Sequence, residues 1–522
     1  MSFANFSCDL VFSGETRDSD CERAFGSIAT TGDATGITLD ETSPIAGTGM
    51  LNVAFSTASA KLQQKAHIRS LSFPAPRVFG YHFRMRRTGS FTADVPLLLN
   101  QGPNRIVMFI DDATNLINVN DNSGTVVMTS TTPVPTSGSI EVWLILDYSN
   151  AGAGPGDGWL FIDGVQEGFG SVRDIPDYFF KNNGGSGLGA DLKVDDMCMV
   201  FSTSADDTPD KVQWPRLKTL AAFPIPSGDA DYTAPSTATD TVTADTGGAH
   251  DISNATGGTT PWATNTWAGH AVTVTIATVT YELYVEANGT DWLDGRWSDY
   301  YGTETVPING GGRTVNIYSE DGWTGVGDVT NKADNWDEDE LPAHDGDTSY
   351  NGQGGGVLGR QLSEGETRAE IGLATDDVLF RVFGRGVSRY GSAPKTPDYA
   401  TQPHVILKGA SNNNKVGMPN SQVGHSITAT YGGFTSAAIK YPGNPGTDEN
   451  GWNSSGSPAD FNACWFGMVS GPSSWTGSNG FRATMLCLVI LFYPASNGLL
   501  PLATRESLVM PRRTIHNFLV TR

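Results

Sequence analysis

The 522-residue chain has few cysteines and few charged residues, and no long apolar run. Its five cysteines (Cys8, Cys21, Cys198, Cys464 and Cys487) form no C-x-x-C pair and are odd in number. This pattern argues against a zinc site and against a dense disulfide framework, although Cys8 and Cys21 could pair. It fits a chain that folds in a reducing cytoplasm, with Cys487 as a small core hydrophobe.

Charged residues make up only 17% of the chain, and 56 acidic residues against 33 basic ones give a formal net charge of −23. A chain this acidic repels phosphate groups, so we expect no binding to nucleic acid. The longest apolar run, Met485 to Phe492, is about a third of a membrane span, so we expect no membrane segment. The first residues lack the basic region and apolar core of a signal peptide, and we expect synthesis in a cytoplasm without export.

Turn residues are abundant, with 62 glycines and 28 prolines, and short alternating segments lie between them. Apolar and polar residues alternate with the period of a β-strand over 81–86, 106–110, 116–120, 140–148, 159–162, 191–201, 272–276, 280–285 and 376–385. Asp163-Gly164 predicts a hairpin turn, and the glycine-rich stretches 150–158 and 184–189 predict loops. We therefore predict an all-β protein: an antiparallel β-sandwich (jelly roll) as the N-terminal domain and a second β-sandwich-like domain at the C-terminus.

Shifts in composition divide the chain into five parts. The predicted parts are a jelly roll over 1–225, a linker or extended arm over 226–265, a segment 266–310, a C-terminal β domain over 311–510 and a basic tail over 511–522. The predicted linker has almost no large apolar residue. Segment 266–310 has room for one small β module or for the opening strands of the last domain. The basic residues between Arg505 and Arg522 could dock onto an acidic neighbour or belong to a frayed terminus.

The first part carries a resemblance to a known family. An alternating strand is followed by a long strand that ends in Leu146-Asp147, a glycine loop, the segment Gly158–Gly164 and the segment Leu192–Phe201. This order resembles the concanavalin A-like lectin/glucanase jelly roll in its laminin-G-like form, over roughly residues 1–225. The resemblance implies two stacked antiparallel sheets, in a fold that hosts sugar-binding, protein-binding and purely structural members.

Three ordered patches carry a second resemblance, over most of residues 315–500. They are Asp321–Thr324 with Asn335–Glu340 and Asp345–Tyr350, then Asp376–Arg385, then Asn444–Thr447 with Gly451-Trp452 and Phe461–Met468. Together they resemble a module common in structural proteins of tailed bacteriophages. One departure is that Asn444-Pro445 stands where the module has Asp-Pro, which weakens the case for a ligand at that turn.

Acidic residues offer no pattern for hydrolysis. A laminarinase-like glucanase of the same sandwich fold has a Glu-x-Asp-x-x-Glu strand, which this sequence lacks. Glu338–Glu340 are contiguous and would alternate between strand faces, so a solvated loop is the simpler interpretation. Asp111-Asp112 and Asp345–Asp347 are acidic turns that do not fit an EF-hand, and Asp195-Asp196 fall where laminin-G-like relatives often carry an acidic residue. We predict no catalytic and no cofactor-binding residue; carboxylates in such turns could hold Ca²⁺, with its ligands undetermined.

The other chemistry-bearing residues are equally scattered. The eight histidines show no metal-ligand spacing, and the chain has no Gly-x-Ser-x-Gly elbow and no P-loop. Trp292, Trp297 and Trp323 lie in Gly/Asp-rich stretches and could either stack on sugar rings or pack in a core or interface.

These patterns and resemblances predict a non-enzymatic structural component of a phage virion, made in the host cytoplasm. It would act as an appendage, capsid decoration or tail-associated protein through protein–protein assembly. Its partners would be other virion proteins and copies of itself in a homo-oligomer, which by family resemblance would be a trimer. The alternative is a carbohydrate- or receptor-binding phage protein whose jelly roll grips host glycans, and a weaker alternative is a glycan-degrading enzyme.

Overall fold

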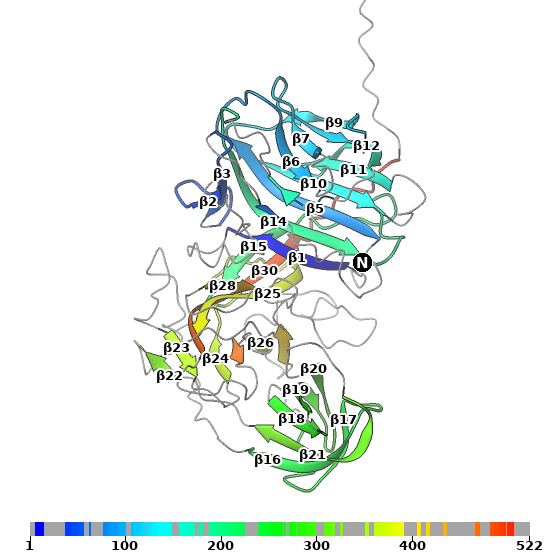
Figure 1. The fold of residues 1–522 in the computed structure, drawn as a ribbon, viewed down its shortest axis with the longest axis vertical. Helices are drawn as coiled ribbons and strands as arrows, with labels where there is room; N and C mark the ends of the chain where they lie inside the picture. Colours follow the sequence, from blue (N-terminus) through cyan, green and yellow to red (C-terminus); the bar gives the residue numbers. More distant parts are fainter. Residues whose placement is uncertain are drawn as a thin grey trace, which may run out of the picture.

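The structure is a computed structural model, and its regular elements are all β-strands, as the sequence predicts (Figure 1). The residues that it describes are 6–14, 37–47, 49–56, 62–63, 77–100, 106–121, 123–148, 156–172, 176, 178–180, 187–224, 238–264, 266–267, 271–277, 279–298, 307–318, 324–326, 350–353, 360–390, 404–408, 414–417, 432–435, 465–469, 481–496 and 498–505. Within these ranges, no helix is long and apolar enough to cross a bilayer.

Two antiparallel sheets build the N-terminal part, which confirms the predicted sandwich. The eight-stranded central sheet runs in the order β12 (Val165–Val172), β11 (Gly156–Ile162), β10 (Ile140–Asp147), β5 (Val78–Arg87), β14 (Leu192–Ser202), β3 (Met50–Val53) and β2 (Ile37–Asp40), with β1 (Phe6–Phe12) also paired to β14. The six-stranded outer sheet runs in the order β4 (Leu62–Gln63), β13 (Tyr178–Phe179), β6 (Val95–Leu99), β7 (Ile106–Ile110), β8 (Leu116–Asn120) and β9 (Val126–Pro133).

A third sheet packs on the far side of the central sheet. This C-terminal sheet runs in the order β22 (Thr324–Val326), β23 (Tyr350–Gln353), β30 (Phe481–Pro494), β25 (Asp377–Tyr390) and β28 (Gly432–Thr435), and β15 (Lys218–Ala222) also pairs with β30. Figure 1 shows β1, β14 and β5 lying over β15, β25 and β30. A further four-stranded sheet consists of β24 (Arg360–Glu364), β29 (Trp465–Val469), β26 (His404–Lys408) and β27 (Asn414–Gly417).

The central sheet is therefore buried on both faces, and alternate side chains of one strand enter different cores. On β10, Val142, Leu144 and Leu146 belong to the core shared with the outer sheet. Trp143 and Ile145, between them, belong to the core shared with the C-terminal sheet. Burial on both faces explains why β10 is almost continuously apolar although its side chains alternate in direction. The same holds for β30, whose residues from Met485 to Leu491 are all buried.

Two arginines of β25 tie the C-terminal sheet to the first strand of the chain. Nη2 of Arg381 donates a hydrogen bond to the carbonyl oxygen of Phe6, and Nη1 of Arg385 donates to Oγ of Ser13 at 2.5 Å. Thr219 of β15 donates to the carbonyl oxygen of Ser13 at 3.0 Å. These bonds connect β1 of the central sheet, and Ser13 directly after it, to the C-terminal sheet. The domain boundary predicted at residue 225 needs a correction, because β15 precedes this boundary and yet extends the C-terminal sheet.

Between β15 and β22 the chain forms a closed six-stranded barrel. Its order is β16 (Asp240–Thr246), β17 (Ile252–Thr256), β20 (Leu293–Ser298), β19 (Val279–Asn288), β18 (Ala271–Ile276) and β21 (Gly310–Tyr318). The linker predicted over 226–265 is wrong where β16 and β17 lie, and β21 crosses the boundary predicted at 310. The first and last strands pair, Asp240 with Ile317, so the chain enters and leaves the barrel at neighbouring points.

Local turn chemistry agrees with the sequence at the β11–β12 hairpin. Asp163 and Gly164 form its two-residue turn with φ of 49° and 80°. Positive φ at both positions is what a type I′ turn requires, and Asp-Gly suits it. The predicted glycine loop 150–158 ends earlier than expected, because Gly156 already pairs with Val172.

Candidate functional site

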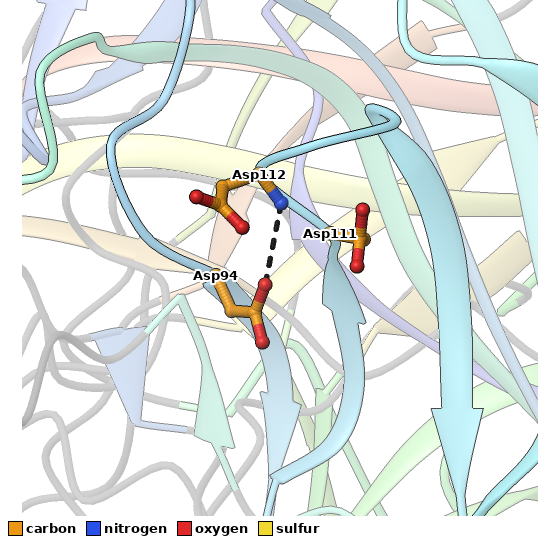
Figure 2. Close-up of side chains that lie close together, drawn as sticks. All are labelled: Asp94, Asp111 and Asp112. Carbon is orange, nitrogen blue, oxygen red and sulfur yellow. Dashed lines mark hydrogen bonds between the residues drawn. The ribbon is translucent and has the colours of Figure 1, made fainter.

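Three carboxylates form an acidic turn cluster at one end of the outer sheet. Asp94 directly precedes β6, and Asp111 and Asp112 directly follow β7. Because Val95 pairs with Ile110 in antiparallel register, the three residues meet at the same end of this hairpin. Figure 2 shows their side chains close together, and one carboxylate oxygen from each lies within 4.8 Å of the others.

The local bonds of this acidic turn cluster affect its members differently. Oδ1 of Asp94 accepts a hydrogen bond from the backbone N–H of Asp112 at 3.2 Å. Partial burial and, after it, the charges of Asp111 and Asp112 nevertheless raise the pKa of Asp94. Oδ1 of Asp111 accepts hydrogen bonds from Oγ1 and the backbone N–H of Thr114 at 2.6 and 2.8 Å, and these bonds lower the pKa of Asp111.

Chemically, the acidic turn cluster can offer oxygen ligands to a hard cation. Ca²⁺ takes six to eight oxygen ligands, so these three carboxylates would supply only part of a coordination shell. The sequence pointed to Asp111 and Asp112, and the structure adds Asp94. The signal that could have found Asp94 is its place immediately before the apolar run Val95–Leu99.

Asp195 and Asp196 hold a β-bulge together instead of facing solvent. The register of β14 against β5 shifts between Asp195 and Cys198, and Asp196 has a φ of 49°. Oδ1 of Asp195 accepts a hydrogen bond from the N–H of Asp196 at 2.9 Å, and its Oδ2 accepts one from the N–H of Ala46 at 2.8 Å. Oδ2 of Asp196 lies 3.1 Å from Nε of Arg84. Both side chains are buried and engaged within the fold, so their role is structural.

A second buried charge network centres on Glu141 of β10. Its Oε2 accepts hydrogen bonds from Nε and Nη2 of Arg216 at 2.8 and 2.6 Å, and its Oε1 accepts one from the indole N–H of Trp143 at 3.2 Å. Nε2 of His82 lies 3.4 Å from Oε1, at ion-pair distance. Burial alone would raise the pKa of Glu141, but His82 and then Arg216 outweigh it and lower this pKa to about 2. Glu141 is therefore a charged structural group throughout the neutral pH range.

Cysteines contribute packing in this part of the fold. Cys8, Cys198 and Cys487 are free thiols buried in the core shared by the central and C-terminal sheets. Burial, together with the neighbouring thiol of Cys8, raises the pKa of Cys198 well above its usual range. A raised pKa disfavours the thiolate, which is the nucleophilic form. The prediction of Cys487 as a core hydrophobe is confirmed.

The barrel brings together a tryptophan, a histidine and a carboxylate that the sequence analysis did not connect. The rings of Trp292 and His250 are stacked, with centroids 4.1 Å apart and planes 3° apart. Nδ1 of His250 lies 2.7 Å from Oδ2 of Asp294. No spacing rule links these residues, because a strand pairing between β17 and β20 creates their proximity.

Several predicted residues lie outside the described ranges. They are Cys21, Cys464, Trp323, Glu338–Glu340, Asp345–Asp347, Asn444-Pro445 and the tail 511–522. Trp297 lies in β20, and nothing is described of its side chain. Arg505, at the start of the basic region, pairs with Asp157 and Asp210, both at 2.6 Å.

The chain matches no protein-family model and no curated protein.

Solved structures that resemble parts of the chain share little sequence with it. A Trypanosoma rangeli sialidase shows 14% identity over 30% of this chain and 25% of its own, with a TM-score of 0.22. The endo-β-1,4-glucuronan lyase of the fungus Trichoderma reesei shows 13% identity over 34% of this chain and 88% of its own, with a TM-score of 0.24. An endo-1,3-β-glucanase from Streptomyces sioyaensis shows 12% identity over 38% of this chain and 97% of its own, with a TM-score of 0.22. The chain spans about a quarter of the sialidase, and similarities this low carry no argument about activity.

Proposed function

We propose that this chain is a non-enzymatic structural component of a phage virion, an appendage, decoration or tail-associated protein that acts by protein–protein assembly. It would assemble as a homo-oligomer, which by the phage resemblance would be a trimer, and contact other virion proteins. The resemblance of 315–500 to a module of tailed-phage structural proteins supports a place on a virion. The stacked sheets support a structural role for the chain.

The observation that supports a structural role most is the use of the buried acidic side chains. Each one among the described residues accepts hydrogen bonds from the fold itself: Glu141, Glu167, Asp195, Asp196, Asp207, Asp240 and Asp377. A catalytic acid or base must instead keep an oxygen within reach of its substrate. These carboxylates serve packing and strand register.

Glycoside hydrolysis would make a different demand on the structure. It needs two carboxyl groups about 5 to 10 Å apart that flank the bond to be cleaved. The acidic turn cluster is more compact than this, and two of its members are engaged by loop N–H groups. This geometry favours assembly over the glycan-degrading alternative.

The purified full chain tests the proposal in two measurements. Light scattering after size-exclusion chromatography gives its oligomeric state, for which we expect a stable homo-oligomer. Antibodies raised against the chain are then applied to phage particles from lysates of cells that carry its gene, and electron microscopy should show label at one defined place on the particles. A monomer that is absent from purified particles would refute the proposal, as would turnover of glycans by the purified chain.

A further inference from the structure

The barrel uses its described tryptophans in two different ways. Trp262 and Trp267 are 4% and 8% exposed, and they pack edge to face in the barrel core with ring centroids 6.4 Å apart. Trp292 lies in the connection between β19 and β20, is half-buried, and is not part of that core. Because the indole is the largest apolar side chain, a solvent-accessible one on a barrel whose core is already filled needs a separate explanation.

Trp292 is held in a fixed orientation from two sides. One face of its indole is stacked on the imidazole of His250 at 4.1 Å. Its Nε1 edge lies against Gly289, where an added Cβ would come within 2.2 Å of Nε1. The ring is thus immobilised before any ligand arrives, which reduces the entropy lost on binding.

His250 is in turn positioned by the carboxylates of the barrel wall. Its Nδ1 contacts Oδ2 of Asp294 at 2.7 Å, and Oδ1 of Asp294 accepts a hydrogen bond from the N–H of Asp251 at 3.0 Å. Oδ2 of Asp251 accepts a hydrogen bond from the N–H of Gly295 at 2.9 Å. His250 and Asp294 keep 33% and 38% of their side-chain surface accessible to solvent, so this support of the indole lies at the surface of the barrel.

We infer that Trp292 and His250 form a sugar platform, a binding site on the barrel for a neutral pyranose ring of a glycan. The apolar C–H face of a pyranose packs against an aromatic face, and its hydroxyl groups need hydrogen-bonding partners at the rim of the ring. Because His250 covers one face of the indole, a sugar would pack on the opposite face. The exposed carboxylate of Asp291, next to Trp292 in the chain, would then accept hydrogen bonds from its hydroxyl groups.

Charge selects among sugars at this site. Asp251, Asp291 and Asp294 lie beside the sugar platform, and the whole chain carries a formal charge of −23. Sialic and uronic acids are anionic and would be repelled, whereas neutral hexoses and N-acetylhexosamines would not. The sequence analysis named Trp292 among the tryptophans that could stack on sugar rings, but its glycan-binding alternative placed the sugar on the jelly roll. Figure 1 shows β17 and β20 in the barrel, at the opposite end of the molecule from the outer sheet.

Glycan binding by the full chain tests the inference directly. The chain is applied to immobilised neutral oligosaccharides (mannotetraose, chitotetraose, cellotetraose and maltotetraose) and to anionic ones (sialyllactose and an alginate tetrasaccharide). We expect binding to at least one neutral glycan, and we expect Trp292→Ala to weaken it by at least about tenfold. Trp292→Phe keeps an aromatic face and should retain most of the affinity. Ile308→Ala removes another exposed apolar side chain of the same barrel, which is 72% exposed, and should leave the affinity unchanged.

A second measurement does not depend on the folding of the alanine variant. The indole N–H signal of Trp292, assigned in the NMR spectrum by its loss in Trp292→Phe, should shift in the wild-type chain during titration with the best neutral glycan. Several results would overturn the inference. They are no binding of any neutral glycan, binding of anionic glycans only, an unchanged affinity in a folded Trp292→Ala chain, and an unmoved indole signal under saturation. Because particle assembly is measured separately, the sugar platform and the proposed structural role stand or fall independently.

Discussion

Glu141 gives the most direct test of how the sandwich and the C-terminal sheet hold together. Its carboxylate joins β10 to Arg216, which lies just before β15, the strand that extends the C-terminal sheet. Glu141→Gln keeps the size of the side chain and an acceptor for the indole N–H of Trp143. It removes only the charge that pairs with Arg216 and faces His82.

The size of the effect follows from the pKa of Glu141. The folded value is about 2 and the usual value is 4.5, a difference of about 2.5 units. At 1.36 kcal/mol per unit, the charge contributes about 3 kcal/mol of stability at pH 7. Because the folded pKa is the lower one, this contribution is complete above pH 4.5 and is lost as the pH falls from 4.5 towards 2. At pH 3 about 1 kcal/mol remains.

Hydrogen–deuterium exchange of the amides in β10 is the suitable assay, since it reports the stability of this region even if the barrel unfolds separately. At pH 7 we expect Glu141→Gln to reduce the protection of these amides by about 100-fold. Urea unfolding at pH 7 and pH 3 should show the difference between variant and wild type shrinking with acidity. Glu41→Gln, at an exposed glutamate, is the control and should stay within about 0.5 kcal/mol of wild type. Equal losses at both pH values, or no loss at pH 7, would refute the reasoning.

Three further perturbations test other parts of the fold. Gly80→Ala would place a Cβ 2.5 Å from the ring of Trp214 and should destabilise the chain by about 1 to 3 kcal/mol in urea unfolding. The control is Gly89→Ala, whose Cβ would have no neighbour nearer than 3.5 Å and which should leave the free energy of unfolding unchanged. Burial and neighbouring charges raise the pKa of Asp94, so its negative charge destabilises the folded state once the pH is above that pKa. Asp94→Asn should therefore increase Tm by about 1 to 2 °C at pH 7 in the presence of a chelator. A decrease in Tm would contradict this account. Asp240 accepts hydrogen bonds from the loop after β17. Asp240→Ala should therefore lower the free energy of opening of the barrel amides, measured by hydrogen–deuterium exchange, by about 2 to 3 kcal/mol. The same free energy for the central-sheet amides should stay unchanged.

The strands of the sandwich could be predicted because their signal is local. Segments 106–110 and 116–120 were predicted from alternation alone, and β7 and β8 have the same bounds. On β8, the core residues Ile117 and Val119 alternate with Asn118 and Asn120, whereas β7 is an apolar run bounded by turn residues. The Asp163-Gly164 turn was predictable for a similar reason, because few residue pairs tolerate positive φ at both positions.

The first two strands of the barrel, β16 and β17, were mistaken for a linker because most of their core-facing side chains are small. Val242, Ala244 and Ala255 face its core, and the volume is completed by Trp262 and Trp267 from outside the strands. Strands rich in Thr and Ala therefore have too few large apolar residues to resemble a folded region. The long-range pairings could not be predicted from the sequence either, since no local pattern links β15 to β30 or His250 to Asp294.

The pairing of β15 with β30 has a consequence for synthesis on the ribosome. Ala222 ends β15, and Phe481, where β30 begins, lies 259 positions later in the chain. At translation rates of about 5 to 20 residues per second, the sandwich emerges roughly 13 to 50 s before its neighbouring layer is complete. During that interval Trp143, Trp159 and Val200 would be exposed to water on an apolar surface that is prone to aggregate. Nascent chains that pause before residue 481 should therefore be strong clients of chaperones, whereas released full-length chains should not.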